Sequence, residues 1–201
     1  MGGTMGLNYA NLNETTRRFM LLEFETGNHF LSPRLAEVAK PRWPDTLRDA
    51  LQYHTDVWLE RELIRRTMML GTETLKSPMG GKTITRAINK EQAAKTLAEG
   101  EFNRYYMRGV CLAAKARGFS QVIVCAGKII PHASRDLIKA VGVPMSIDAL
   151  LENLRSNNYT KNDAILGAPM GSGLSAFLSV RLPQAGEAVI RRAAPKTETV
   201  S

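Results

Sequence analysis

The chain has 201 residues, of which 44% are hydrophobic and 6% aromatic, and it carries a formal net charge of +8 at pH 7. This length and apolar content suit one domain with an aliphatic core, and no apolar run approaches the roughly 18 residues of a membrane span. We therefore expect neither a membrane partner nor a secretory leader, and the positive charge favours nucleic acid or another acidic surface as the partner.

The first half of the sequence predicts a flexible arm followed by three helices. Residues 1–12 contain three glycines and no strong hydrophobic period, which favours an arm. The side chain of Asn13 is suited to cap a helix that runs to about residue 25. After a proline-rich stretch, the pattern predicts a helix over 45–53 and a second one over 56–70. These two helices are expected to pack as an antiparallel pair.

The middle of the chain predicts a long loop and then the main helix. Residues 71–90 are poor in apolar side chains and rich in glycine, which is typical of a functional or mobile loop. Helical character returns over 91–97, and Gly100 is expected to separate that piece from an amphipathic helix over 101–117. A short β-branched run at 121–125 predicts a buried strand that packs against the apolar side of this helix.

Basic residues gather on the opposite side of the helix over 101–117. Arg104, Arg108 and Lys115 share one face by the helical period. Together with Lys82 and Arg86 from the preceding loop, they could follow a phosphate backbone or contact an acidic protein. No aromatic side chain lies on the same face to stack on bases, so a plain solvated face is the competing interpretation.

The last part of the chain predicts two short helices, a final strand and a tail. Ser134 is expected to cap a helix to residue 140, and Ser146 one that ends at residue 155. Residues 176–182 predict the last strand. The resulting fold class is α/β, with mixed α+β left open, in one domain over 13–185 with helices packed on a small sheet. A disordered tail is expected over 186–201.

Motifs for catalysis, nucleotides or metals are incomplete. Residues 80–83, Gly-Gly-Lys-Thr, resemble the end of a phosphate-binding loop, but Lys76 stands where that motif requires glycine. Ser172 lacks the glycine spacing of a hydrolase nucleophile. We expect no cofactor and no metal. Three histidines are too far apart for a helical zinc site, although a role in a tertiary site stays open: His29, His54 and His132.

A metal-dependent nuclease would need clustered carboxylates. Lys128 follows the predicted strand, as a nuclease lysine often does, but no carboxylate directly precedes it. Glu99 and Glu101 are close in sequence, yet the expected break at Gly100 separates them. We therefore assign no catalytic residues.

Three motifs occur in order between residues 95 and 183: EGEFNRYYMRGVCLAAKARG, LLENLRSNN and GSGLSAFLSVRLP. In this region the chain resembles uncharacterised proteins that tailed bacteriophages and prophages encode near their virion genes. The resemblance implies a virion protein assembled in the host cytoplasm, and it carries no known chemistry. Our first hypothesis is a structural, non-enzymatic head or neck component that binds other virion proteins and forms a homo-oligomer. The second is a basic nucleic-acid-binding protein that contacts DNA, and the third is a nuclease.

Overall fold

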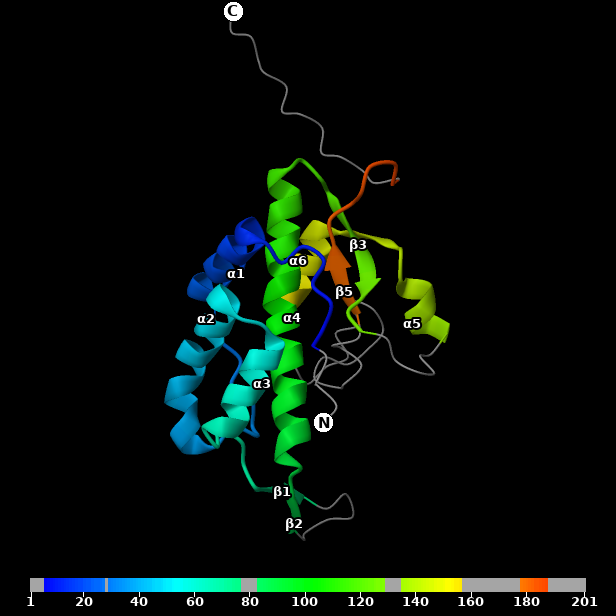
Figure 1. Ribbon diagram of the computed structural model, residues 1–201. Coiled ribbons are helices and arrows are strands. Elements are labelled where there is room, and N and C mark those ends of the chain that lie inside the picture. The colour runs from blue at the N-terminus through cyan, green and yellow to red at the C-terminus, as the bar shows by residue number, and fades with distance from the viewer. Residues whose placement is uncertain (1–5, 28, 77–82, 129–134, 157–177, 188–201) are drawn as a thin grey trace, which may run out of the picture.

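One long helix, α4 (Lys90–Ala116), runs through the middle of the molecule (Figure 1). Three helices from the first half of the chain cover one side of it. A small sheet and the helix α6 (Ile147–Arg155) lie on the other side. This computed structural model describes residues 6–27, 29–76, 83–128, 135–156 and 178–187. The arrangement is mixed α+β, which confirms that form of the predicted fold class.

The helices beside α4 are α1 (Glu14–Thr26), α2 (Trp43–Tyr53) and α3 (Asp56–Arg65), with a 3-10 helix, η1 (Glu37–Arg42), before α2. Asn13 caps α1 as predicted, because its side-chain oxygen accepts a hydrogen bond from the Thr16 amide at 3.0 Å. The prediction of a helix over 56–70 is wrong at its end. The chain leaves the helix at Arg66, and Thr67 then takes a positive φ of 52°.

Helix α4 corrects the prediction of two pieces over 91–97 and 101–117. It is continuous through Gly100. A glycine inside a helix costs about 1 kcal/mol relative to alanine. Burial of Leu97 and Phe102 on either side outweighs that cost, since fully burying one such side chain contributes about 1.5–3 kcal/mol. The helix ends where predicted, at Gly118, whose φ of 81° suits glycine.

The sheet beside α4 has three antiparallel strands in the order β4–β3–β5. Strand β3 (Gln121–Ala126) confirms the predicted buried strand, and β5 (Leu178–Arg181) lies within the predicted last strand. Strand β4 (Pro144–Ser146) was not predicted, because three residues are too few to show a period. A short helix, α5 (Arg135–Ala140), precedes β4, and Ser146 caps α6 as predicted.

A hairpin stands where the sequence predicts a loop over 71–90. Strands β1 (Thr72–Lys76) and β2 (Thr83–Ala87) pair antiparallel, and the hairpin extends past the N-terminal end of α4 (Figure 1). Its threonines have a high strand propensity, which the low apolar content concealed. The loop prediction is therefore wrong over these two strands.

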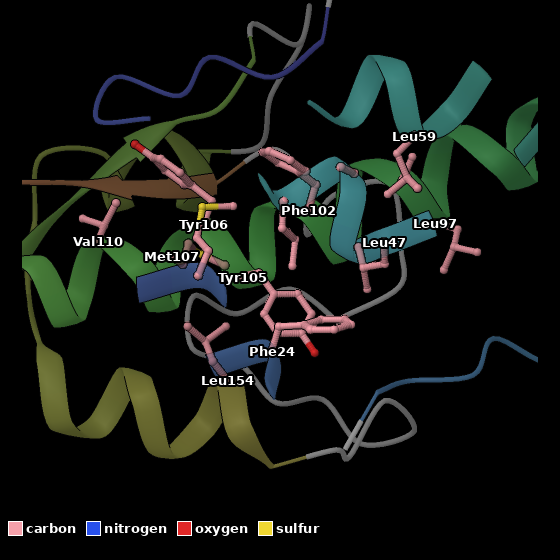
Figure 2. Packing of buried hydrophobic residues seen from close by; sticks show 14 of the residues in the cluster. Phe24, Leu47, Leu59, Leu97, Phe102, Tyr105, Tyr106, Met107, Val110 and Leu154 are labelled. Carbon is pink, nitrogen blue, oxygen red and sulfur yellow. The ribbon is translucent and has the colours of Figure 1, made fainter. Parts of the chain in front are cut away.

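The core surrounds α4 rather than lying on one face of it. Every residue from 101 to 111 is buried, so the helix is covered on all sides. This confirms it as the central element, and Val122 of β3 joins the same cluster as predicted. Figure 2 shows side chains of the neighbouring helices around those of α4: Phe24, Leu47, Leu59 and Leu154 around Phe102, Tyr105, Tyr106, Met107 and Val110.

The predicted flexible arm over 1–12 is wrong for residues 6–12, which are packed into the fold. The Leu7 amide donates a hydrogen bond to Asp56 Oδ2 at 3.0 Å, and the side chain of Leu7 is buried. Asn11 bridges two elements: its amide donates to Tyr106 Oη at 2.9 Å, and its Oδ1 accepts from the Leu182 amide at 2.8 Å. These contacts tie the segment to α3, α4 and the end of β5.

Candidate functional site

The two central residues of the predicted basic stripe are buried. Arg104 and Arg108 are each 3% exposed. Nε of Arg104 donates a hydrogen bond to the Leu154 carbonyl at 2.8 Å, and Nη2 of Arg108 donates to the same oxygen. The prediction of a solvent-facing stripe is therefore wrong for both. The two arginines are buried because α6 packs on this face of α4. The last carbonyls of a helix need donors from outside the helix, and the arginines supply them to Leu154.

The other predicted contact residues lie at separate places. Lys115 is partly exposed near the end of α4, and its Nζ pairs with Asp148 Oδ1 at 2.9 Å. Arg86 lies on the hairpin and pairs with Glu73 at 2.5 Å. Lys82 lies outside the residues that the structure describes. The predicted set therefore does not form one continuous basic surface within the described residues.

Arg104 and Arg108 belong to a buried network of charged and aromatic side chains on α4. Nη1 of Arg104 lies 3.9 Å from Oε1 of Glu101, and the guanidinium carbon of Arg108 lies 5.0 Å from the ring centroid of Tyr105. Burial raises the pKa of Glu101 to about 7, although Arg104 and Arg108 act in the opposite direction. Burial also lowers the pKa of Arg108, and the neighbouring charge of Arg104 adds to that effect.

A pocket of about 170 Å³ opens beside this network. It lies where the C-terminal ends of α1 and α6 meet the middle of α4. Glu23 and Arg155 form one wall as a two-point ion pair, with N–O distances of 2.5 and 3.0 Å. The residues that line the pocket come from three helices and the cap of α1: Glu23, Thr26, Gly27, Arg108 and Arg155.

Sequence reasoning did not single out Glu23, Gly27 or Arg155. Glu23 and Arg155 are 132 positions apart, so no local pattern connects them. Glu23 is one of three glutamates on α1, and Arg155 is an ordinary basic residue in the last turn of α6. The available signal was indirect: a predicted helix end at 155 requires donors for its last carbonyls.

A second polar cluster lies on the other side of α4. Nζ of Lys128 pairs with Oε2 of the buried Glu99 at 2.5 Å, so this lysine does meet a carboxylate, supplied by a distant helix. Asp56 is buried nearby, and its pKa is raised mainly by burial and further by the charge of Glu99. Within the described part of the chain, no three or more histidine, cysteine or acidic side chains are placed to hold a metal ion.

The described histidines lie in separate aromatic contacts. His29 stacks on Phe24 with ring centroids 4.0 Å apart, and burial lowers its pKa. His54 stacks on Trp58 at 4.2 Å. Neither lines the pocket beside Arg108. His132 lies outside the described residues.

Comparisons with protein-family models, with curated proteins and with solved structures found no match. None of the helices in the described residues has the length and hydrophobicity needed to span a membrane. We therefore infer function from the geometry together with the sequence motifs.

Proposed function

We propose that this protein is a structural, non-enzymatic subunit of a tailed-phage particle, in its head or neck. It acts through contacts with copies of itself and with other virion proteins. The observation that carries the proposal is the exposed hairpin β1–β2. The phage-like motifs between residues 95 and 183 support the same class of protein.

The hairpin has the properties of an element that a neighbouring subunit completes. Every residue of β2 is exposed. Leu75 and Ile84 face each other in the register and are 41% and 55% exposed. No other described strand pairs with either edge. An isolated two-stranded hairpin is only marginally stable, and free edges and apolar pairs are what strand addition by a partner uses.

The charged residues favour protein contacts over nucleic acid. Arg104 and Arg108 are enclosed by the fold, and the exposed ends of Lys115 and Arg86 already pair with carboxylates. A backbone-tracking groove would need several exposed cations in a row. Nucleic-acid binding stays the second hypothesis, now without its two central residues.

The first experiment measures self-association of the purified full chain by light scattering across a concentration series. We expect oligomers, and replacing both Leu75 and Ile84 by serine should weaken association about tenfold or more, as loss of an apolar hot spot does. Val38→Ser is the matched control, because Val38 is 82% exposed but lies on η1. A wild-type chain that stays monomeric, or a control that weakens association equally, would contradict the role of the hairpin.

The second experiment addresses the particle itself. Particles from a phage or lysogen that carries the gene are washed in high salt and detergent and analysed by mass spectrometry. We expect the protein to remain at a fixed ratio to the other virion proteins. Recovery only from the cytosol of infected cells, with none in washed particles, would refute a structural role in the virion.

A further inference from the structure

The pocket between α1, α4 and α6 contains more positive than negative charge. Arg108 and Arg155 both line it, whereas Glu23 is its single carboxylate. Both carboxylate oxygens of Glu23 accept hydrogen bonds from Arg155. Arg108 has no described carboxylate oxygen within the 4.0 Å of an ion pair. Glu23 and Glu101 act on this guanidinium only from a longer distance, so a group that is 3% exposed has no direct ion-pair partner among the described residues.

The position of Arg108 turns one edge of its guanidinium toward the pocket. Nη2 is held by the Leu154 carbonyl, and the group lies over the Tyr105 ring. Nε has no hydrogen-bond partner among the described residues. Nη1 lies 3.9 Å from the point that a Cβ on Gly27 would occupy, and Gly27 is itself part of the pocket wall. Nη1 therefore lies at the pocket wall, and the guanidinium is also engaged by a hydrogen bond with the side chain of Tyr105.

Arg155, which is half-exposed, also has a donor that its ion pair does not use. It uses Nε and Nη2 for Glu23, and no described acceptor takes a hydrogen bond from Nη1. A guanidinium has five N–H donors in a planar fork that matches the geometry of carboxylate and phosphate oxygens. Two arginines with free donors therefore meet in one small cavity.

The energetic argument also favours an anion here. A buried charge without a partner is costly, and the Leu154 carbonyl, as the end of a helix, supplies only a partial negative charge. The pocket has room for about five waters, at roughly 30 Å³ each, which is enough for a small oxyanion. Binding would give Arg108 a full negative charge in direct contact, which the described residues do not supply.

We propose that this pocket binds a small oxyanion, a carboxylate or a phosphate group, with the guanidinium of Arg108 as its main ligand and that of Arg155 as the second. Glu23 holds Arg155 in place and lies in the wall as a negative charge. That charge disfavours a phosphate dianion relative to a carboxylate monoanion, since like charges at close range repel. Acetate is therefore expected to bind at least as well as phosphate.

The test measures the unfolding midpoint of the full chain against increasing sodium phosphate or sodium acetate, with sodium chloride added to keep ionic strength constant. A ligand that binds only the folded state raises the midpoint in a saturable manner. We expect saturable rises for the wild-type chain and a calorimetric dissociation constant to match. No saturable effect of either anion would overturn the proposal.

Two variants locate the effect. Arg108→Gln should weaken anion binding about tenfold or more, as loss of a charge-assisted hydrogen bond does. Its control is Arg48→Gln, which removes a half-exposed arginine that pairs with Glu25 of α1 outside the pocket. That control should bind as the wild type does. Equal responses of the two variants would overturn the proposal.

Arg108→Gln removes a buried group and can fail to fold, so a second variant keeps the charge. Gly27→Ala puts a methyl group at the pocket wall, 3.1 Å from the Glu23 carbonyl oxygen and 3.9 Å from Nη1 of Arg108. It should raise the dissociation constant for phosphate more than that for the smaller acetate. Unchanged binding of both anions in this variant would place the site elsewhere and overturn the proposal.

Discussion

Two glycines on α4 are expected to respond in opposite ways to replacement by alanine. A Cβ on Gly100 would meet no atom within 4 Å outside its own helix. A Cβ on Gly109 would lie 2.7 Å from Met20 Cγ and 2.8 Å from the Thr16 carbonyl oxygen. The first glycine weakens the helix without a packing reason, whereas the second permits the close approach of α1.

The magnitudes follow from these distances. Gly100→Ala should stabilise the chain by about 0.5–1 kcal/mol, the helix preference of alanine over glycine. Gly109→Ala gains the same preference but overpacks the α1–α4 contact, which typically costs about 1–3 kcal/mol. The cost should be near the upper end, because the Thr16 carbonyl is backbone and cannot rotate away. We expect a net destabilisation of about 2 kcal/mol.

Thermal unfolding of the two variants beside the wild type provides the assay. For a chain of this length, 1 kcal/mol shifts the midpoint by about 2–4 °C, so the variants should differ by about 5–10 °C. Urea unfolding with unchanged slopes would confirm that the folded states are alike. A shift of both midpoints in the same direction would refute either the continuity of α4 at Gly100 or the tight contact at Gly109.

Two further predictions concern buried polar groups on α4. Asn103→Ala should cost about 3 kcal/mol in urea unfolding, because Nδ2 of Asn103 donates to the Leu178 carbonyl at 2.8 Å and Oδ1 accepts from Ser179 Oγ at 2.7 Å. In the Asn103→Ala background, replacing Ser179 by alanine should cost less stability than it does in the wild type. A loss of unfolding free energy below about 1 kcal/mol for Asn103→Ala would contradict the network. Glu101 binds its proton more tightly in the folded chain, so stability should fall as the pH rises from about 4.5 to about 7. Glu101→Gln should flatten that part of the profile, and an unchanged profile would disprove the raised pKa.

Features with a local signal were predictable from the sequence. The caps of α1 and α6 follow from the side chains of Asn13 and Ser146, and the end of α4 from Gly118, because each acts on neighbouring backbone. Strand β3 was predictable because a short β-branched run carries its own signal. The hairpin β1–β2 was not, since exposed threonine-rich strands lack the apolar alternation that marks a half-buried strand.

The site could not be predicted because its contacts join distant parts of the chain. A helical wheel places Arg104 and Arg108 opposite the aromatic side chains, but in the structure the guanidinium of Arg108 lies over the ring of Tyr105. The wheel cannot show that α6 covers this face, as Leu154 lies 46 and 50 positions away. The predicted helix break at Gly100 was wrong for a related reason. Tertiary packing overrides the cost of a glycine in a helix, which is about 1 kcal/mol.

The buried arginines also change what the net charge of +8 implies. A basic balance favours an acidic macromolecular partner only where the charges reach the surface. Arg104 and Arg108 do not, and Lys128 and Arg155 are engaged by buried carboxylates of α4 and α1. Part of the excess positive charge is therefore directed into the fold, where it can act on a small anion in a pocket. The exposed hairpin β1–β2 is then the surface that we propose for a large partner.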